Sequence, residues 1–202
     1  MEEYERLCAN LTAPLTHLDR LHDHFVLLAT RVRRISYTPG PDAHTKIVPL
    51  NLDVAFLARE SAQVLSELSY RTYASMPGRN AVLQSLRTLV IDSALATAAL
   101  TNALQSNPFP TAAPHQAVPP ENQQREPDYM MAWHLAESSN LLERSSFTCR
   151  NIYDSMVWDL DVADQAPNQR HTAYVLAAQE TAARTAAPTP PCKSAPRAAP
   201  RR

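Results

Sequence analysis

The sequence predicts an all-α fold, and three observations lead to this prediction. Only two of the 202 residues are glycine, against an average of roughly 7%. Tight turns, bulges and phosphate-binding loops, which need glycine, are therefore disfavoured. Alanine and leucine are frequent, whereas aromatic residues make up 6%. The 17 prolines gather mainly in residues 39–49, 108–127 and 188–200, which leaves long proline-free stretches for helices.

Two helices are predicted before residue 35. Residues 3–12 can form a short helix that ends near Pro14. Thr16 can cap the next helix, which runs to about Arg34 and ends in arginines that suit the negative end of a helix dipole. The apolar residues of this second helix recur every three or four positions, as an amphipathic helix requires. They are Leu18, Leu21, Phe25, Leu28 and Val32.

Residues 35–50 predict a different structure. An extended piece and a turn around Gly40 precede residues 45–50, which are β-prone. Pro49 would restrict such a segment to a sheet edge, so we expect a small β-like strip here. Asn51 or Asp53 can cap a helix over about 52–75, and Pro77-Gly78 then breaks the chain.

The second half of the chain predicts two further helical regions around a loop. Residues 79–106 form a long pattern that is apolar on much of its surface, so this helix is expected to be buried in its own bundle or against a neighbouring subunit. Residues 107–127 hold six prolines and predict a long irregular loop. Asp128 can cap a helix over 129–143, and a shorter element follows at 150–158.

The composition divides the chain into one domain over 1–162 and a flexible tail rich in Ala, Pro and Arg over 163–202. Residues 171–184 of the tail could form a transient helix, whereas 186–202 are expected to be disordered. The first 160 residues carry 13 basic and 17 acidic side chains, and residues 161–202 carry six basic and three acidic ones. The body is therefore not a generic basic nucleic-acid binder.

Catalytic, cofactor, metal and membrane signals are not found in the sequence. There is no glycine-rich nucleophile turn and no apolar run long enough to span a membrane. His17, His22 and His24 lie close together without a further ligand at metal-binding spacing, so a solvated helix face is the better interpretation. The three cysteines suggest free thiols, and Cys149 is expected to be packed in the core. We therefore expect no enzyme, no cofactor and no metal.

Arginines near the turn at 77–78 are candidate RNA-binding residues. Arg71 and Arg79 flank this turn, with Tyr70 and Tyr73 nearby. A helix-hairpin tip of this kind could contact a phosphate backbone and stack on bases. The alternative is that these are ordinary surface arginines.

A second candidate motif consists of Arg150, Tyr153, Asp154 and Trp158. Arg150 and Asp154 have the i,i+4 spacing of a helical ion pair. If the pair is buried beside the two aromatic residues, removing one partner would cost about 3–5 kcal/mol. If it is exposed, the pair would contribute little.

This motif resembles the Arg-x-x-aromatic-acid pattern that ends the ordered fold of the coat proteins of rod-shaped plant RNA viruses, of the tobamovirus, tobravirus and hordeivirus kind. Residues 7–10 are similar to that family's first short helix, residues 45–58 to its β-like strip and following helix, and residues 107–127 to its inner loop. The resemblance covers 3–75 and 108–160, whereas 79–107 has no clear counterpart.

The resemblance implies a four-helix bundle that polymerises into a helical rod around single-stranded viral RNA. It implies RNA contacts near the end of the third helix and the start of the fourth, for which Arg71, Arg79, Arg87 and Arg125 are the candidates here. A coat protein would be found in virions and in the host cytoplasm. The alternative is a helical scaffold or tegument-like interaction protein without RNA packaging, which binds partners through the 79–106 helix and the tail.

Overall fold

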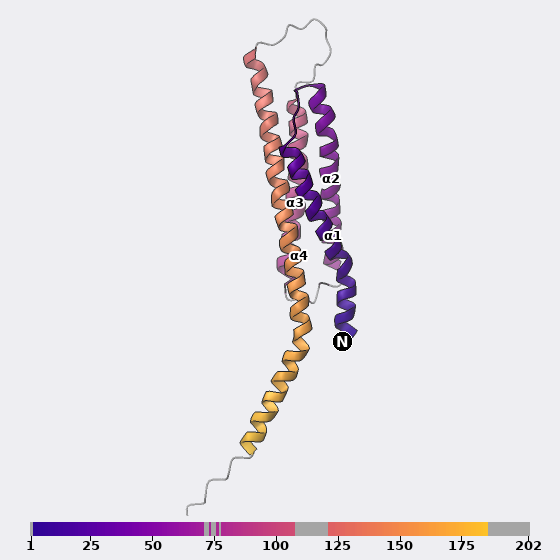
Figure 1. Ribbon diagram of the computed structural model, residues 1–202, viewed down its shortest axis with the longest axis vertical. Helices are drawn as coiled ribbons and strands as arrows, with labels where there is room; N and C mark the ends of the chain where they lie inside the picture. The colour runs from indigo at the N-terminus through magenta and orange to yellow at the C-terminus, as the bar shows by residue number, and fades with distance from the viewer. Residues whose placement is uncertain (1, 71–72, 74–75, 77, 108–120, 186–202) are drawn as a thin grey trace, which may run out of the picture. The chain divides into compact units, whose positions relative to one another are not determined.

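The computed structural model is all-helical (Figure 1). It describes residues 2–70, 73, 76, 78–107 and 121–185, and within these residues it contains four helices and no strand. The helices are α1 (Glu2–Arg33), α2 (Pro41–Tyr70), α3 (Arg79–Ser106) and α4 (Glu121–Thr185). The all-α prediction is therefore confirmed for the described part of the chain.

The chain divides into two compact units, residues 1–163 and 164–202. All four helices contribute to the first unit, where they pack around one hydrophobic core (Figure 1). In the second unit, the helical residues are 164–185. The flexible tail expected from residue 163 stays a prediction, and residues 186–202 lie outside the described residues.

Helices α1 and α2 run antiparallel, because residues late in one contact residues early in the other. His17 Nε2 lies 3.0 Å from Glu60 Oε2, and Arg31 donates a 3.2 Å hydrogen bond to Asp53. Helix α2 pairs with α3 in the same way. Asn51 donates a 3.2 Å hydrogen bond to the hydroxyl of Thr101.

The predicted β-like strip at 45–50 is wrong, because these residues belong to α2. Pro41 occupies the first helical position, where its fixed φ suits a helix and its missing N–H is not needed. Asp42 accepts a 2.7 Å hydrogen bond from the Thr38 N–H just before the helix. The buried residues of this segment are spaced three or four apart, so burial of this helical stripe outweighs the local β preference. They are Ala43, Ile47, Leu50, Val54 and Leu57.

Helix α1 also differs from the prediction, since it continues through Pro14 instead of ending there. Pro14 is buried and lies between the buried Leu11 and Leu18 at helical spacing. Its ring therefore adds apolar surface to the stripe that faces the core. Two hydroxyl groups bond to carbonyls four residues earlier on either side of the proline, Thr12 to Cys8 and Thr16 to Thr12, each at 2.8 Å.

Helix α4 unites elements that the sequence analysis separated. Residues 108–120 lie outside the described part. One helix runs from Glu121 onward, where the sequence predicted the end of a loop over 107–127, a helix over 129–143 and a separate element over 150–158. The physical reason is that no proline or glycine occurs between Asp128 and Ala166. A continuous inward stripe also runs along this stretch and consists of Met131, Leu135, Leu142, Cys149, Ile152 and Met156.

Candidate interaction surface

The inward face of α4 carries buried serines that fix its rotation. Ser138 donates a 3.1 Å hydrogen bond to the carbonyl of Ala96 in α3, and Ser139 donates a 3.2 Å bond to the carbonyl of Ala29 in α1. Both serine side chains are small enough to let the helix backbones approach closely. Because these bonds hold α4 against both neighbours, the opposite face of α4 must point outward.

The outward face carries four large aromatic side chains, which we call the aromatic row. They are Tyr129, Trp133, Phe147 and Trp158, with exposed fractions of 69%, 49%, 69% and 68%. Their spacings are close to one, four and three helical turns, so the four rings share one face over about 44 Å. Both tryptophans of the chain are in this row. Exposed aromatic residues of this size are typical of protein interfaces.

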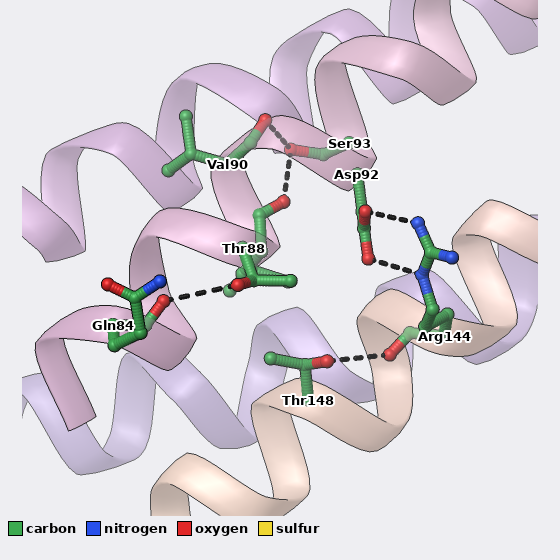
Figure 2. A network of polar contacts seen from close by, with 8 residues as sticks. Gln84, Thr88, Val90, Asp92, Ser93, Arg144 and Thr148 are labelled. Carbon is green, nitrogen blue, oxygen red and sulfur yellow. Dashed lines mark hydrogen bonds and ion pairs between the residues drawn. The ribbon is translucent and has the colours of Figure 1, made fainter. Parts of the chain in front are cut away.

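Contacts on either side of the aromatic row join α4 to its neighbours. On the α3 side, Arg144 donates hydrogen bonds of 2.6 Å and 2.5 Å to the two carboxylate oxygens of Asp92 (Figure 2). On the α1 side, Glu143 lies 2.5 Å from Arg33. The hydrogen bond from Arg33 holds the pKa of the Glu143 carboxyl below its usual value. The row therefore lies between an α3 contact and an α1 contact, and faces away from α2.

Asp92 is the buried partner in the α3 contact. Its side chain is 3% exposed, whereas that of Arg144 is 60% exposed. Figure 2 shows that the nearby hydroxyls of Thr88, Ser93 and Thr148 bond to carbonyls of their own helices. The Asp92–Arg144 pair is thus the polar contact in this view that joins the two helices. The sequence analysis missed it, although an acid at a core position of α3, three residues after Leu89, was a usable signal.

A second exposed apolar surface, which we call the α1/α2 groove, lies between α1 and α2. Its cavity has a volume of about 210 Å³. It is lined by His24, Leu27, Leu28, Arg31, Asp53, Phe56 and Leu57. Leu27 and Phe56 are exposed, and the guanidinium of Arg59 lies 5.1 Å from the centre of the Phe56 ring. This distance is short enough for a cation–π interaction.

Helix α3 has the bounds predicted for the long apolar helix, and its inward residues are buried as expected. Its outward face still presents the exposed side chains of Ile91 and Leu95. Exposed apolar groups therefore occur on α3 as well as on the faces formed by α1, α2 and α4.

Two of the predicted RNA-binding arginines, Arg79 and Arg125, lie toward opposite ends of the bundle. Arg79 begins α3, Arg87 is exposed two turns further along, and Arg125 lies in the first turns of α4. The side chain of Arg125 and the whole of Arg71 lie outside the described residues. Because Ala96 pairs with Ser138, the start of α4 lies beside the end of α3. Arg125 is therefore about 45 Å from Arg79 along the bundle, so these two positions do not share one end.

The Arg150 motif forms, but at the surface. Arg150 Nε lies 3.3 Å from Asp154 Oδ1, with both side chains more than half exposed, and the Arg150 guanidinium lies 5.3 Å from the Tyr153 ring centre. Trp158 is part of the aromatic row. The buried form of this motif is thus excluded. The hydrogen bonds of Ser138 and Ser139 set the rotation of α4 about its axis, and this rotation turns the motif outward.

A buried pair next to this motif was also missed. The hydroxyl of Tyr73, between α2 and α3, donates a hydrogen bond to Asp159 of α4, and both side chains are buried. Burial and this hydrogen bond raise the pKa of the Tyr73 phenol. A cavity of about 420 Å³ beside the pair is lined by Gly78, Ala81, Asp154, Ser155, Trp158 and Asp159.

The histidines and Cys149 have structural surroundings. His17 pairs with Glu60, and His22 Nδ1 lies 3.0 Å from the carbonyl oxygen of Ser146, so the predicted solvated face applies to His24 and not to these two. Cys149 is buried as predicted, and burial raises the pKa of its thiol to about 12. The described residues contain no cluster of three or more His, Cys, Asp or Glu suited to a metal ion.

Comparison with known proteins gives no relative: no family model, no curated protein and no solved structure matches this chain. Among the described residues, no helix combines the length and apolar character that crossing a membrane requires.

Proposed function

We propose that this protein is a helical scaffold, which acts by binding other protein surfaces through its exposed helix faces. The observation that supports the proposal best is the aromatic row on α4. Fully buried aromatic side chains remove about 150–250 Å² each from water. At the exposed fractions of the row, its four rings offer roughly 400–600 Å², at least half of the ~800 Å² that each partner contributes to a standard interface.

The row has the composition of an interface centre and not of a solvated surface. Trp and Tyr are enriched among the residues that carry most of the binding energy in interfaces. The serine bonds to Ala96 and Ala29 prevent α4 from turning the rings inward. Leaving this apolar area in water therefore brings no benefit to the isolated fold, whereas covering it would stabilise a complex.

Site-specific photo-cross-linking in the expressing cell tests this proposal. A photoreactive amino acid at Phe147, in the row, should give discrete adducts of defined mass. The control is the same amino acid at Gln63, an exposed polar position on α2. Adducts at both positions, or at neither, would contradict a binding role for the row.

A coat protein that packages single-stranded RNA is the second candidate, and it would place the protein in virions and the host cytoplasm. One observation favours it: exposed apolar surfaces lie on more than one side of the molecule, as a polymer requires. The separation of Arg79 from Arg125 gives RNA binding less support, because these positions cannot form one basic site on a single copy.

Electron microscopy with nuclease-protected RNA separates the two candidates. Rods that protect RNA, with protection lost in the Arg79→Ala, Arg87→Ala double variant, would favour the coat function. Assemblies or complexes that contain no protected RNA would favour the scaffold.

A further inference from the structure

We infer that the partner of the α4 face is a second copy of this chain, which presents its α1/α2 groove, so that copies stack side by side in an open row. This inference rests on the scaffold function proposed above and names its partner. It is carried by where the two surfaces lie, by the apolar side chains that they expose and by their charges.

The two surfaces lie on different sides of one molecule. Helix α1 contacts α2 and α4, and α3 contacts α2 and α4, as the bonds His17–Glu60, Ser139–Ala29, Asn51–Thr101 and Ser138–Ala96 show. The helices therefore follow one another around the core in chain order. The α1/α2 groove lies on the edge opposite the α3/α4 edge, where Arg144 reaches Asp92.

The two surfaces also lie at the same height along the bundle. The groove contains Leu27, Leu28 and Arg31, and Ala29 between them is bonded to Ser139 of α4. At this level of α4 a hollow of about 390 Å³ opens on the outer face. We call it the α4 hollow, and it is lined by Trp133, Ala136, Glu137, Asn140, Leu141 and Arg144. Two copies placed side by side without any axial shift would therefore bring the groove edge against the hollow.

The two surfaces offer apolar side chains to each other. Phe56 and Leu27 line the groove, and about half of each residue is exposed. The volume of the α4 hollow falls within the roughly 300–1,000 Å³ of pockets that enclose drug-sized molecules, which gives it room for a Phe ring and a Leu side chain. Trp133 forms one wall of the hollow and would lie against the incoming ring, as aromatic pairs prefer.

The charges at the contact are complementary. Arg59 lies over Phe56 and forms no ion pair with another described residue, so it would be carried to the rim of the hollow with the ring. Glu137 lines the hollow, and the ion pair described for it is a long 3.5 Å contact with His134. The other charges of the two surfaces are already paired within the molecule, Arg31 with Asp53 and Arg144 with Asp92. The free cation of one copy thus meets the available carboxylate of the next.

A contact between two different surfaces is not self-complementary, and because these two surfaces lie on opposite edges of the molecule, successive copies do not turn back to close a ring. Each copy keeps one unused groove and one unused hollow, so addition continues and produces an open row. Both surfaces are encoded by the same chain and are always present in equal amounts. This predicts association that grows with protein concentration and does not stop at the dimer.

Sedimentation velocity of the full chain over a concentration series tests the inference. The wild type should form a ladder of species, and Phe56→Ser or Trp133→Ser should each weaken association at least about tenfold, as the loss of an interface anchor does. Val162→Ser, which removes an exposed apolar side chain about 27 Å along α4 from Arg144, is the control and should leave the ladder unchanged. Circular dichroism melting of each variant establishes that it is folded.

Mixing the two variants gives the sharpest result. Phe56→Ser keeps an intact hollow and Trp133→Ser keeps an intact groove, so the mixture should form dimers and stop there.

The charge pair gives a second test, since Arg59→Glu and Glu137→Arg should each weaken association and should restore it when combined in one chain. No dimer in the mixture and no rescue would overturn the proposed contact. A wild type that stays monomeric at all concentrations would overturn self-association, and adducts of Phe147 with another protein would still support the scaffold function.

Discussion

Arg144 of α4 donates hydrogen bonds to both carboxylate oxygens of the buried Asp92 of α3 (Figure 2). A buried charge without a partner is strongly destabilising, whereas a paired one is tolerated. Arg144 itself is well exposed and reaches inward over the helix surface. The pair therefore makes the packing of α3 against α4 depend on one surface arginine.

Arg144→Ala is expected to lower the free energy of unfolding by about 1–3 kcal/mol, because it leaves Asp92 buried without its cation. Arg150→Ala is the matched control on the same helix, and its exposed i,i+4 pair with Asp154 should contribute about 0–0.5 kcal/mol. Urea denaturation of both variants measures the difference. Adding Asp92→Asn to Arg144→Ala should recover part of the loss, since an amide is easier to bury than a carboxylate. Equal effects of the two alanine variants would contradict the role given to burial.

Gly78→Ala is expected to destabilise the protein although the backbone at residue 78 is in the ordinary right-handed helical region. A Cβ at this position would lie 2.9 Å from Cγ of Asp159 and closer still to its oxygens. The carboxylate would have to leave its hydrogen bond with Tyr73, at a cost of about 1–3 kcal/mol.

A double-mutant cycle with Asp159→Ala checks this explanation. In that background the methyl group has room, so Gly78→Ala should have a much smaller effect, and the coupling between the two changes should exceed about 0.5 kcal/mol. Additive effects would show that the close approach to Asp159 is not what requires glycine.

Helices could be predicted from the spacing of apolar residues, whereas the effect of a single proline depends on what the surrounding helix buries. Helix α3 could be predicted to the residue, because glycine precedes it and no proline interrupts it. Pro14 was interpreted as the end of a helix and Pro49 as the mark of an edge strand, yet both lie inside helices. In each case a buried stripe continues at helical spacing past the proline, and the burial of that stripe outweighs the single lost hydrogen bond.

The outward direction of the aromatic row could not be predicted. The spacing of four residues places Tyr129 and Trp133 on one helix face, but whether that face is inside or outside depends on how α4 is rotated. That rotation is set by Ser138 and Ser139, whose partners are backbone carbonyls of α3 and α1. Such contacts leave no pattern in the sequence, since any residue can supply a carbonyl. For the same reason the sequence leaves open whether the motif that contains Trp158 is buried or exposed.

Cys149 is expected to resist thiol reagents in the folded protein. Burial raises the pKa of its thiol from 9.0 to about 12, so the reactive thiolate is about 1,000-fold scarcer than for an ordinary cysteine near pH 8. A Cys8→Ser, Cys192→Ser variant leaves this thiol alone for measurement with a colorimetric reagent. The reaction should be slow in buffer and fast in denaturant. Fast labelling in buffer would show that this part of α4 opens readily.

Alkaline pH should destabilise the protein through Tyr73. Its pKa in the folded state is raised above the ordinary value of 10.0 by burial and by the hydrogen bond to Asp159. Above pH 10 the unfolded chain releases this proton while the folded protein retains it, so the free energy of unfolding must fall as pH rises. Below pH 10 both states are protonated and the contribution is fully present. Burial also raises the pKa of Tyr37, which acts in the same direction.

Denaturant titrations from pH 8 to 11 should therefore show a smaller loss of stability in Tyr73→Phe than in the wild type. The remaining loss should be reduced further in the double variant Tyr37→Phe, Tyr73→Phe. An unchanged slope in the single variant would mean that the Tyr73 hydroxyl reaches solvent and is not held by Asp159.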